Sequence, residues 1–163
     1  MNRVRFYIAI IFARLAYVAI RLLNRSSGTS FVGMMTLKIC SSFLKYCKLY
    51  MKNAKTIAVT GTNGKTTTSG LLAQILEVGK NNVIHNVKGA NMLTGIANVF
   101  ALNLSILPNK FNYAVLESDE AYLTKLYDDY KSEYLLVTNL FRDQLDRYGE
   151  LETTASFIRN AIE

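Results

Sequence analysis

One segment of the chain reads KTIAVTGTNGKTTT, from Lys55 to Thr68. Its apolar, β-branched start predicts a strand over 56–59, its glycines at Gly61 and Gly64 predict a tight turn, and a helical pattern follows. Glycines let backbone N–H groups converge on a phosphate, and the start of a helix adds the positive end of its dipole. The segment therefore predicts a phosphate-binding loop between a strand and a helix.

Two side chains of this loop are expected to act on a nucleotide. In the generic motif the lysine contacts the β- and γ-phosphates and the next hydroxyl binds Mg²⁺, which gives these roles to Lys65 and Thr66. The generic spacing would place a glycine at position 59, where this chain has Val59. A plain strand, turn and helix with incidental glycines is the alternative. The motif is favoured because its strand and helix both lie where it requires them.

Composition and charge limit the classes of protein that the chain can belong to. Its 163 residues are half hydrophobic with a single proline, which predicts a folded domain with an appendage. Cys40 and Cys47 are too few for a disulfide framework or a four-cysteine zinc site, and they fit a reducing cytoplasm. Residues 1–55 contain ten Lys or Arg and no acid. This basic region predicts an anionic neighbour, and nucleic acid is disfavoured because no nucleic-acid-binding module is recognisable.

The N-terminal segment is apolar and basic. Its longest uninterrupted apolar run, 6–13, is too short to span a bilayer, and Arg14 follows it. Arg3, Arg14, Arg21 and Arg25 fall on one helical stripe, so we predict an amphipathic helix. Three roles stay open: packing against the following domain, lying on an anionic membrane surface, or acting as a cleaved targeting peptide.

Strands alternate with helices along the rest of the chain. Further strands are predicted over 82–86, 111–116 and 133–138, and helices at about 92–104, 122–131 and 151–162, with one or two short helices between 31 and 51. The helix at 122–131 is polar and is expected on the outside. The helix after the loop should end at Gly79, and its apolar face should consist of Leu71, Leu72, Ile75 and Leu76. This alternation predicts an α/β fold with a parallel sheet flanked by helices.

Glu117 follows a predicted buried strand, at the edge of the sheet where parallel sheets bind ligands. It is the preferred Mg²⁺ ligand, because the metal must bridge protein and phosphate oxygens. Asp119 and Glu120 either assist it or are acids favoured at a helix N-terminus. His85 is the only histidine and has no metal-like partner nearby in the sequence, so we expect a structural role.

Two further loops follow predicted strands. Lys88 and Asn91 either touch a substrate or phosphate or belong to an ordinary loop before a helix. Polar side chains that are candidates for substrate contact or for support of the site also follow the strand at 133–138, namely Asp143, Gln144, Asp146 and Arg147.

Three motifs together resemble the Mur ligase family, which includes folylpolyglutamate synthetase. They are TGTNGKTT at 60–67, VLESDE at 115–120 and TNLFRDQLDRYG at 138–149. A valine at position 59 is normal for that variant of the loop. Gln144 stands where the family usually has histidine. Three features together, this glutamine, the loop GANM at 89–92 and the Arg-rich N-terminus, are most similar to the branch of the family that amidates lipid II.

The resemblance implies amidation of the D-glutamate α-carboxylate in the lipid II stem peptide. ATP would phosphorylate that carboxylate, and ammonia from a partner glutaminase would displace the phosphate. The implied nucleotide-binding residues are Gly61, Thr62, Asn63, Gly64, Lys65, Thr66, Thr67 and Asn139. Lys65 and Glu117 would be catalytic, and Thr66 and Glu117 would hold Mg²⁺. The glutaminase would form a heterodimer with the protein, at the cytoplasmic face of the bacterial membrane where lipid II lies.

The resemblance also implies two domains. Residues 1–53 would be a basic helical region, and residues 54–163 the N-terminal portion of a central ATP-binding domain of the Mur ligase type. The family has a longer central domain and a C-terminal domain, and the amidating branch has a zinc ribbon. We therefore expect an incomplete chain that binds nucleotide weakly, completes no amidation alone and lacks the zinc-binding part. A Mur-type ligase that adds an amino acid and a non-catalytic ATP-binding scaffold are the alternatives.

Overall fold

The computed structural model describes residues 2–23, 29–86, 90–104, 111–141 and 151–163. Four parallel strands form one sheet in the order β2-β3-β1-β4. The strands are β1 (Lys55–Thr60), β2 (Val83–His85), β3 (Tyr113–Glu117) and β4 (Tyr134–Val137). The helices are α1 (Asn2–Leu22), α2 (Thr29–Ile39), α3 (Phe43–Tyr50), α4 (Lys65–Val78), α5 (Leu93–Asn103), α6 (Glu120–Asp129) and α8 (Leu151–Ile162). The predicted parallel α/β fold is confirmed.

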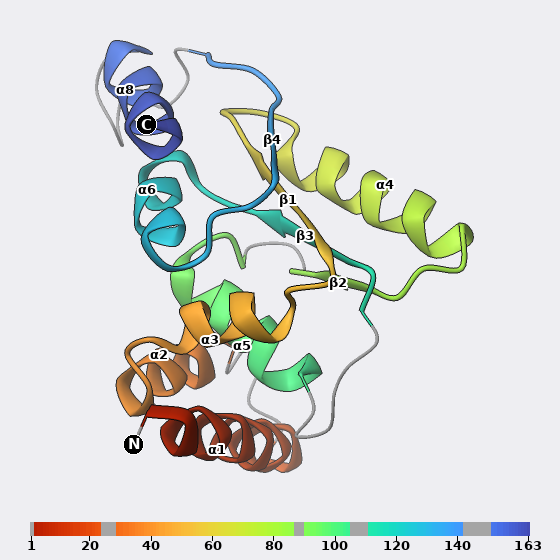
Figure 1. Cartoon of the computed structure of the whole chain (residues 1–163), viewed down its shortest axis with the longest axis vertical. Helices are drawn as coiled ribbons and strands as arrows, with labels where there is room; N and C mark the ends of the chain where they lie inside the picture. The colour runs from red at the N-terminus through yellow and green to blue at the C-terminus, as the bar shows by residue number, and fades with distance from the viewer. Residues whose placement is uncertain (1, 24–28, 87–89, 105–110, 142–150) are drawn as a thin grey trace.

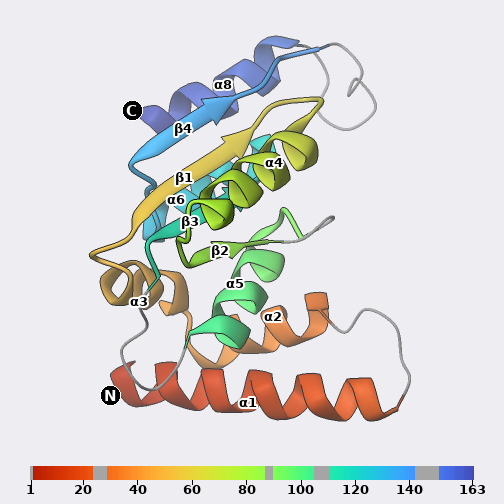
Figure 2. The same cartoon turned by 90° about the vertical axis from the view of Figure 1, so that its right-hand side faces the viewer.

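Helices lie on both faces of the sheet (Figures 1 and 2). Val59 and Val115 share one face and pack with Ala73 of α4, while Ala58 packs on the other face with Leu123 of α6. Successive side chains of a strand point to opposite faces, so each buried strand must be apolar on both sides. This explains the unbroken run of buried residues from Ala58 to Thr60.

Helix α4 ends where the sequence predicted, with Gly79 at its C-cap, but the predicted apolar face is wrong in part. Leu72 and Leu76 pack against the sheet, whereas Leu71 and Ile75 are 57% and 59% exposed. The buried side of the helix also contains small residues, such as Ala73. By helical geometry Ala73 lies on the same side as Leu72 and Leu76, and Leu71 and Ile75 lie on the solvent side.

Helix α6 is also less peripheral than its polar sequence predicted. Leu123 and Leu126 are completely buried, and so is Tyr130 at the C-cap. The helix packs against α8 on the face of the sheet opposite α4 (Figure 2). Its polar residues therefore mark only the outer side of a helix whose inner side belongs to the core.

The basic N-terminal helices pack against the α/β part of the chain. Phe6 and Ile10 of α1 share one hydrophobic cluster with Phe43 of α3, Phe100 of α5 and Leu116 of β3. Packing of α1 on the following domain is thus observed, and the domain boundary after residue 53 stays a prediction. No helix among the described residues has both the length and the apolar character needed to cross a membrane.

The backbones of α2 and α5 touch each other. A Cβ atom built on Gly33 of α2 would lie 1.7 Å from the carbonyl oxygen of Thr94 in α5, so only glycine fits at this position. This close contact fixes α5 against the N-terminal helices. Because α5 follows the loop that contains Asn91, it also fixes one side of the candidate site.

Candidate phosphate-binding site

The loop between β1 and α4 has the conformation expected of a phosphate-binding loop. Gly61 and Gly64 have φ values of +122° and +81°, which side-chain-bearing residues rarely adopt. Gly64 is the N-cap of α4, and its carbonyl oxygen accepts the first helical hydrogen bond from Thr68 N at 2.8 Å. The first N–H groups of a helix have no acceptor within that helix. The loop therefore presents backbone donors and the positive end of a helix dipole at one place.

The segment after β4 braces this loop. Asn63 N donates to Asn139 Oδ1 at 3.0 Å, and Asn139 Nδ2 donates back to Asn63 O at 3.1 Å. Thr62 N donates to Asn139 O at 2.9 Å, and Thr138 Oγ1 donates to Asn63 O at 2.7 Å. A Cβ atom on Gly61 would lie 2.4 Å from Thr138 Oγ1. The structure thus places Asn139 against the loop itself, and direct contact with a nucleotide stays a prediction.

Lys65 points back into its own loop. Its ammonium group donates to the carbonyl oxygens of Gly61 and of Thr62, the latter at 3.1 Å. It also lies 3.4 Å from Glu120 Oε2, and both side chains are almost completely buried. Glu120 begins α6, and its contact with Lys65 is neither of the two roles considered for it in the sequence, which were to assist Glu117 or to favour a helix N-terminus. Asp119 instead caps α6, because its Oδ1 accepts from Ala121 N at 3.2 Å.

Glu117 lies beside the last residues of β1, where it pairs in register with Val59. The side chain of Asn86 holds its backbone from both sides: Glu117 N donates to Asn86 Oδ1, and Asn86 Nδ2 donates to Glu117 O, each at 2.8 Å. Asn91 Nδ2 donates to Glu117 Oε1 at 3.3 Å. The glutamate is thus fixed by a residue that follows β2 and by one that precedes α5.

The residues around Glu117 fit a magnesium ion. Its Oε2 atom is buried and has no hydrogen-bond partner among the described residues. Mg²⁺ takes one or two carboxylates and completes its shell with waters and substrate phosphates, so it needs no cluster of protein ligands. Within the described part of the chain, no group of three or more His, Cys, Asp and Glu could hold a metal. The pattern suits Mg²⁺ shared with a phosphate and gives no support for a zinc centre in these residues.

His85 has the structural role that the sequence predicted for it. Its Nε2 lies 3.2 Å from Ser69 Oγ, which in turn donates to Thr66 O at 3.3 Å. Burial lowers the pKa of the imidazole, and this effect outweighs the opposing attraction of Glu117 and Glu77. The neutral ring therefore connects β2 to the first turn of α4.

The structure tests only part of the predicted site. It brings the loop, Asn139, Glu117 and Asn91 to one edge of the sheet. Thr66 and Thr67 lie in the first turn of α4, and their contacts with metal or nucleotide stay predictions. Lys88, Asp143, Gln144, Asp146 and Arg147 lie outside the described residues. The sequence analysis missed Asn86, although its position directly after β2 at the ligand-binding edge was a usable signal.

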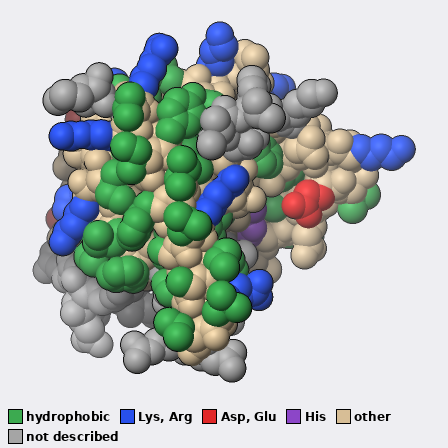
Figure 3. All heavy atoms as spheres, turned by 90° about the horizontal axis from the view of Figure 1, so that it is seen from below, with side chains coloured by type: hydrophobic (Ala, Val, Ile, Leu, Met, Phe, Trp, Pro, Cys, Tyr) green, Lys and Arg blue, Asp and Glu red, His purple; other side chains and the backbone are tan. Residues whose placement is uncertain are grey.

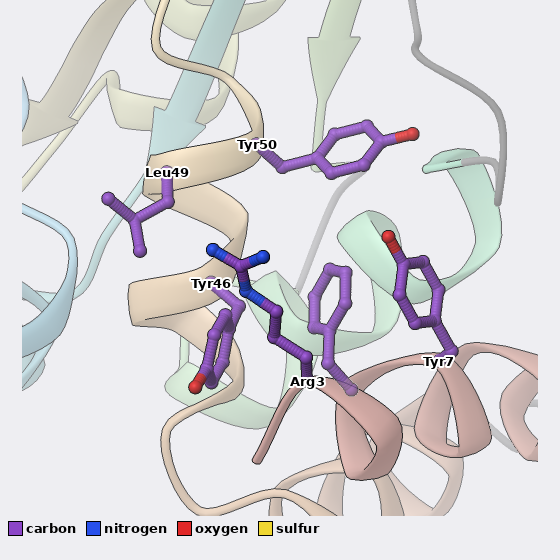
Figure 4. A pocket seen from close by; sticks show the side chains of 6 residues that line it. Arg3, Tyr7, Tyr46, Leu49 and Tyr50 are labelled. Atoms are coloured by element: carbon purple, nitrogen blue, oxygen red, sulfur yellow. The ribbon is translucent and has the colours of Figure 1, made fainter. Parts of the chain in front are cut away.

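A pocket lies elsewhere, between α1 and α3 (Figure 4). Its volume is about 180 Å³, which is below the ~300–1,000 Å³ typical of ligand sites. It is lined by Arg3, Phe6, Tyr7, Tyr46, Leu49 and Tyr50. None of these residues belongs to the loop between β1 and α4, so the pocket is separate from the candidate phosphate-binding site.

Known proteins that are similar to this chain include members of a family of ligases. A family model described as the Mur ligase middle domain matches residues 59–158. Two curated relatives bear the name lipid II isoglutaminyl synthase (glutamine-hydrolyzing) subunit MurT. The one from Streptococcus pneumoniae is 47% identical over 111 residues, which are 68% of this chain and 25% of its own length. The one from Staphylococcus aureus is 34% identical over 158 residues, which are 97% of this chain and 35% of its own length.

A solved structure of MurF from Acinetobacter baumannii has a similar fold. The TM-score is 0.62 at 18% sequence identity, and the match covers 78% of this chain and 27% of that chain. At this identity the likeness concerns the fold alone. The chain spans about a quarter to a third of the length of all three proteins.

Proposed function

Because this chain belongs to the Mur ligase family, we propose that it is the ATP-binding part of a ligase that amidates lipid II. The observation that carries the proposal is the meeting of a braced phosphate loop and a buried carboxylate at one edge of the sheet. The names of the two curated relatives support the choice of lipid II and of glutamine as the source of ammonia.

In the proposed reaction the chain positions groups and neutralises charge. Bound MgATP would transfer its γ-phosphoryl group to the D-glutamate α-carboxylate, giving an acyl phosphate and ADP, and ammonia would then attack the acyl carbon and release inorganic phosphate. The backbone from Gly61 to Thr66 holds the phosphates, and Lys65 neutralises their charge. Thr66 and Glu117 hold Mg²⁺ through oxygen atoms. Asn86 and Asn91 keep the Glu117 carboxylate in place, as groups behind a metal ligand commonly do.

Lys65 must move for this role. In the structure its ammonium is bound to two loop carbonyl groups and lies near Glu120. We infer that bound phosphates replace the two loop carbonyl groups as partners of the ammonium, while Glu120 stays beside it. Both the lysine and the buried glutamate then keep an oppositely charged partner.

The partners belong to the same proposal. Ammonia would come from a glutaminase subunit in a heterodimer, and lipid II is carried by the membrane, so the reaction would take place at its cytoplasmic face. Because the chain spans a quarter to a third of its curated relatives, the residues that bind lipid II and glutaminase are expected in part elsewhere in the longer proteins.

An assay that compares ammonia or glutamine with free amino acids as the source of the nucleophile tests the proposal. The protein with its glutaminase should convert lipid II to its amidated form with glutamine or ammonia, as measured by mass spectrometry, and should not attach free amino acids. Lys65→Ala should abolish ATP binding and turnover, whereas Lys125→Ala, at an exposed position on α6, should change neither. Attachment of an amino acid would identify a Mur-type ligase of another kind. ATP binding without any turnover would identify a scaffold.

A further inference from the structure

Helix α1 has two apolar faces. Phe6, Ala9, Ile10 and Ala13 are buried against the rest of the protein. The opposite face holds a second stripe of large apolar side chains, each between 46% and 81% exposed: Val4, Ile8, Ile11, Leu15, Val18 and Leu22. Their spacings of four, three, four, three and four residues place them on one line along the helix. The helix therefore packs with one face and presents a continuous apolar stripe with the other.

This stripe lies on the outside of the molecule. In two perpendicular views α1 is at the end of the structure opposite β4 and α8 (Figures 1 and 2). Seen from the α1 end, hydrophobic side chains gather over the surface and Lys and Arg side chains stand among and around them (Figure 3). A large exposed apolar patch with a polar rim usually marks a docking surface.

Charge indicates what the stripe docks on. By helical geometry Arg3 and Arg21 flank one side of the stripe and Arg5 the other, and the first acidic residue of the chain is Glu77. Arg14 lies on the same flank as Arg3, but it donates to Leu104 O at 2.8 Å and is held at the end of α5. An apolar stripe with cationic flanks and no acid matches an anionic lipid surface.

Partly buried aromatic side chains lie between α1 and α3, beside the N-terminal part of α1. Arg3 stands at the pocket between α1 and α3, beside Tyr7, Tyr46 and Tyr50 (Figure 4). Tyrosine favours the boundary between lipid and water, because its ring is apolar and its hydroxyl is polar. This end of α1 thus has the side chains that are common at a membrane interface.

We propose that the outer face of α1 docks on the surface of an anionic phospholipid membrane, with the helix axis parallel to the membrane. The apolar stripe enters the boundary between headgroups and acyl chains, and Arg5 and Arg21 contact lipid phosphates. A second copy of the chain fits less well, because two copies would bring these arginines together. The inference does not depend on the ATP chemistry of the site.

Vesicle flotation of the full chain tests the proposal. The protein should bind vesicles that contain phosphatidylglycerol, and Leu15→Gln with Leu22→Gln should reduce its partition coefficient at least about tenfold. Leu71→Gln with Ile75→Gln, at similarly exposed positions on α4, is the matched control and should bind as the parent does. Circular dichroism and ATP binding should be unchanged in both double variants, which separates membrane docking from the proposed catalytic function.

A variant that removes two arginines tests whether positive charge contributes to membrane binding. Arg5→Gln with Arg21→Gln should weaken binding to phosphatidylglycerol vesicles by about fivefold per arginine and leave binding to phosphatidylcholine unchanged. The proposal is overturned if the parent does not bind vesicles, or if the α4 variant loses as much binding as the α1 variant. It is also overturned if sedimentation shows a dimer that the Leu15 and Leu22 changes dissociate, since a second copy would then occupy the stripe.

Discussion

Lys65 and Glu120 form an ion pair inside the protein, with Nζ 3.4 Å from Oε2 and side chains that are 9% and 0% exposed. The pair joins the start of α4 to the start of α6 across 55 residues of sequence. A buried carboxylate without its cation is costly, so the lysine stabilises the protein without nucleotide, in addition to the phosphate contact that we propose for it.

We therefore expect two separable effects from Lys65→Ala. ATP affinity should fall at least about a hundredfold, because charge-assisted contacts to the phosphates are lost. The free energy of unfolding without nucleotide should fall by about 3 kcal/mol, since Glu120 is left buried and unpaired. Urea denaturation and calorimetric titration measure the two quantities. Adding Glu120→Gln should recover much of the stability and none of the affinity. If the Lys65→Ala protein were as stable as the parent, the ion pair would not contribute to the stability of the fold.

Asn139→Ala should loosen the phosphate loop. The substitution removes two hydrogen bonds to the backbone of Asn63, at 3.0 and 3.1 Å. We expect a loss of about 1–2 kcal/mol in stability and about tenfold in ATP affinity, because the loop is less well ordered before it binds. Asn103→Ala, on the exposed side of α5, is the control and should leave ATP affinity unchanged. Equal affinities for Asn139→Ala and the parent would contradict the bracing role.

Gly61→Ala and Gly70→Ala should have opposite effects. Position 61 has a φ of +122°, and a Cβ there would lie 2.4 Å from Thr138 Oγ1, so we expect a loss of at least about 2 kcal/mol. Gly70 lies inside α4 and a Cβ there would meet no atom within 4 Å, so alanine should stabilise the protein by about 0.5–1 kcal/mol. Thermal unfolding of both variants measures the difference. Destabilisation by both would show that α4 tolerates no added side chain.

Local patterns predicted much of the fold and part of the site. The strand, loop and helix around Lys65 and the acid after β3 each depend on residues that are adjacent in sequence. The order β2-β3-β1-β4 depends on long-range contacts, for which the alternating pattern has no signal beyond parallel pairing. The contact between Lys65 and Glu120 was missed for the same reason. Because Glu120 also begins a helix, its sequence context suggested a dipole effect or support of Glu117, and neither interpretation points to Lys65.

Tyr130→Phe should leave the protein as stable or more stable. The ring is completely buried against Phe100, and its hydroxyl has no hydrogen-bond partner among the described residues. Burial raises the pKa of this phenol far above its usual range, so the group stays neutral. Removing an unsatisfied buried hydroxyl should add up to about 1 kcal/mol to the free energy of unfolding. A clear loss in urea denaturation would show that the hydroxyl has a partner in solution.

His85 should make the stability of the protein depend on pH. Burial lowers its pKa in the folded state, so below the ordinary value of 6.5 the unfolded chain binds the proton more readily. The contribution of the histidine to the free energy of unfolding is therefore fully present above pH 6.5, the ordinary pKa. It should be lost as the pH falls from that value towards and through the folded pKa. Urea denaturation without Mg²⁺ measures this effect. Between about pH 7.5 and 5.5 most carboxylates stay ionised, so the histidine is the main group whose protonation changes. His85→Gln can still bond to Ser69 and should remove this part of the pH dependence. The same slope in both proteins would show that another group is responsible, and a gain in stability at low pH would mean that the imidazolium is favoured in the fold.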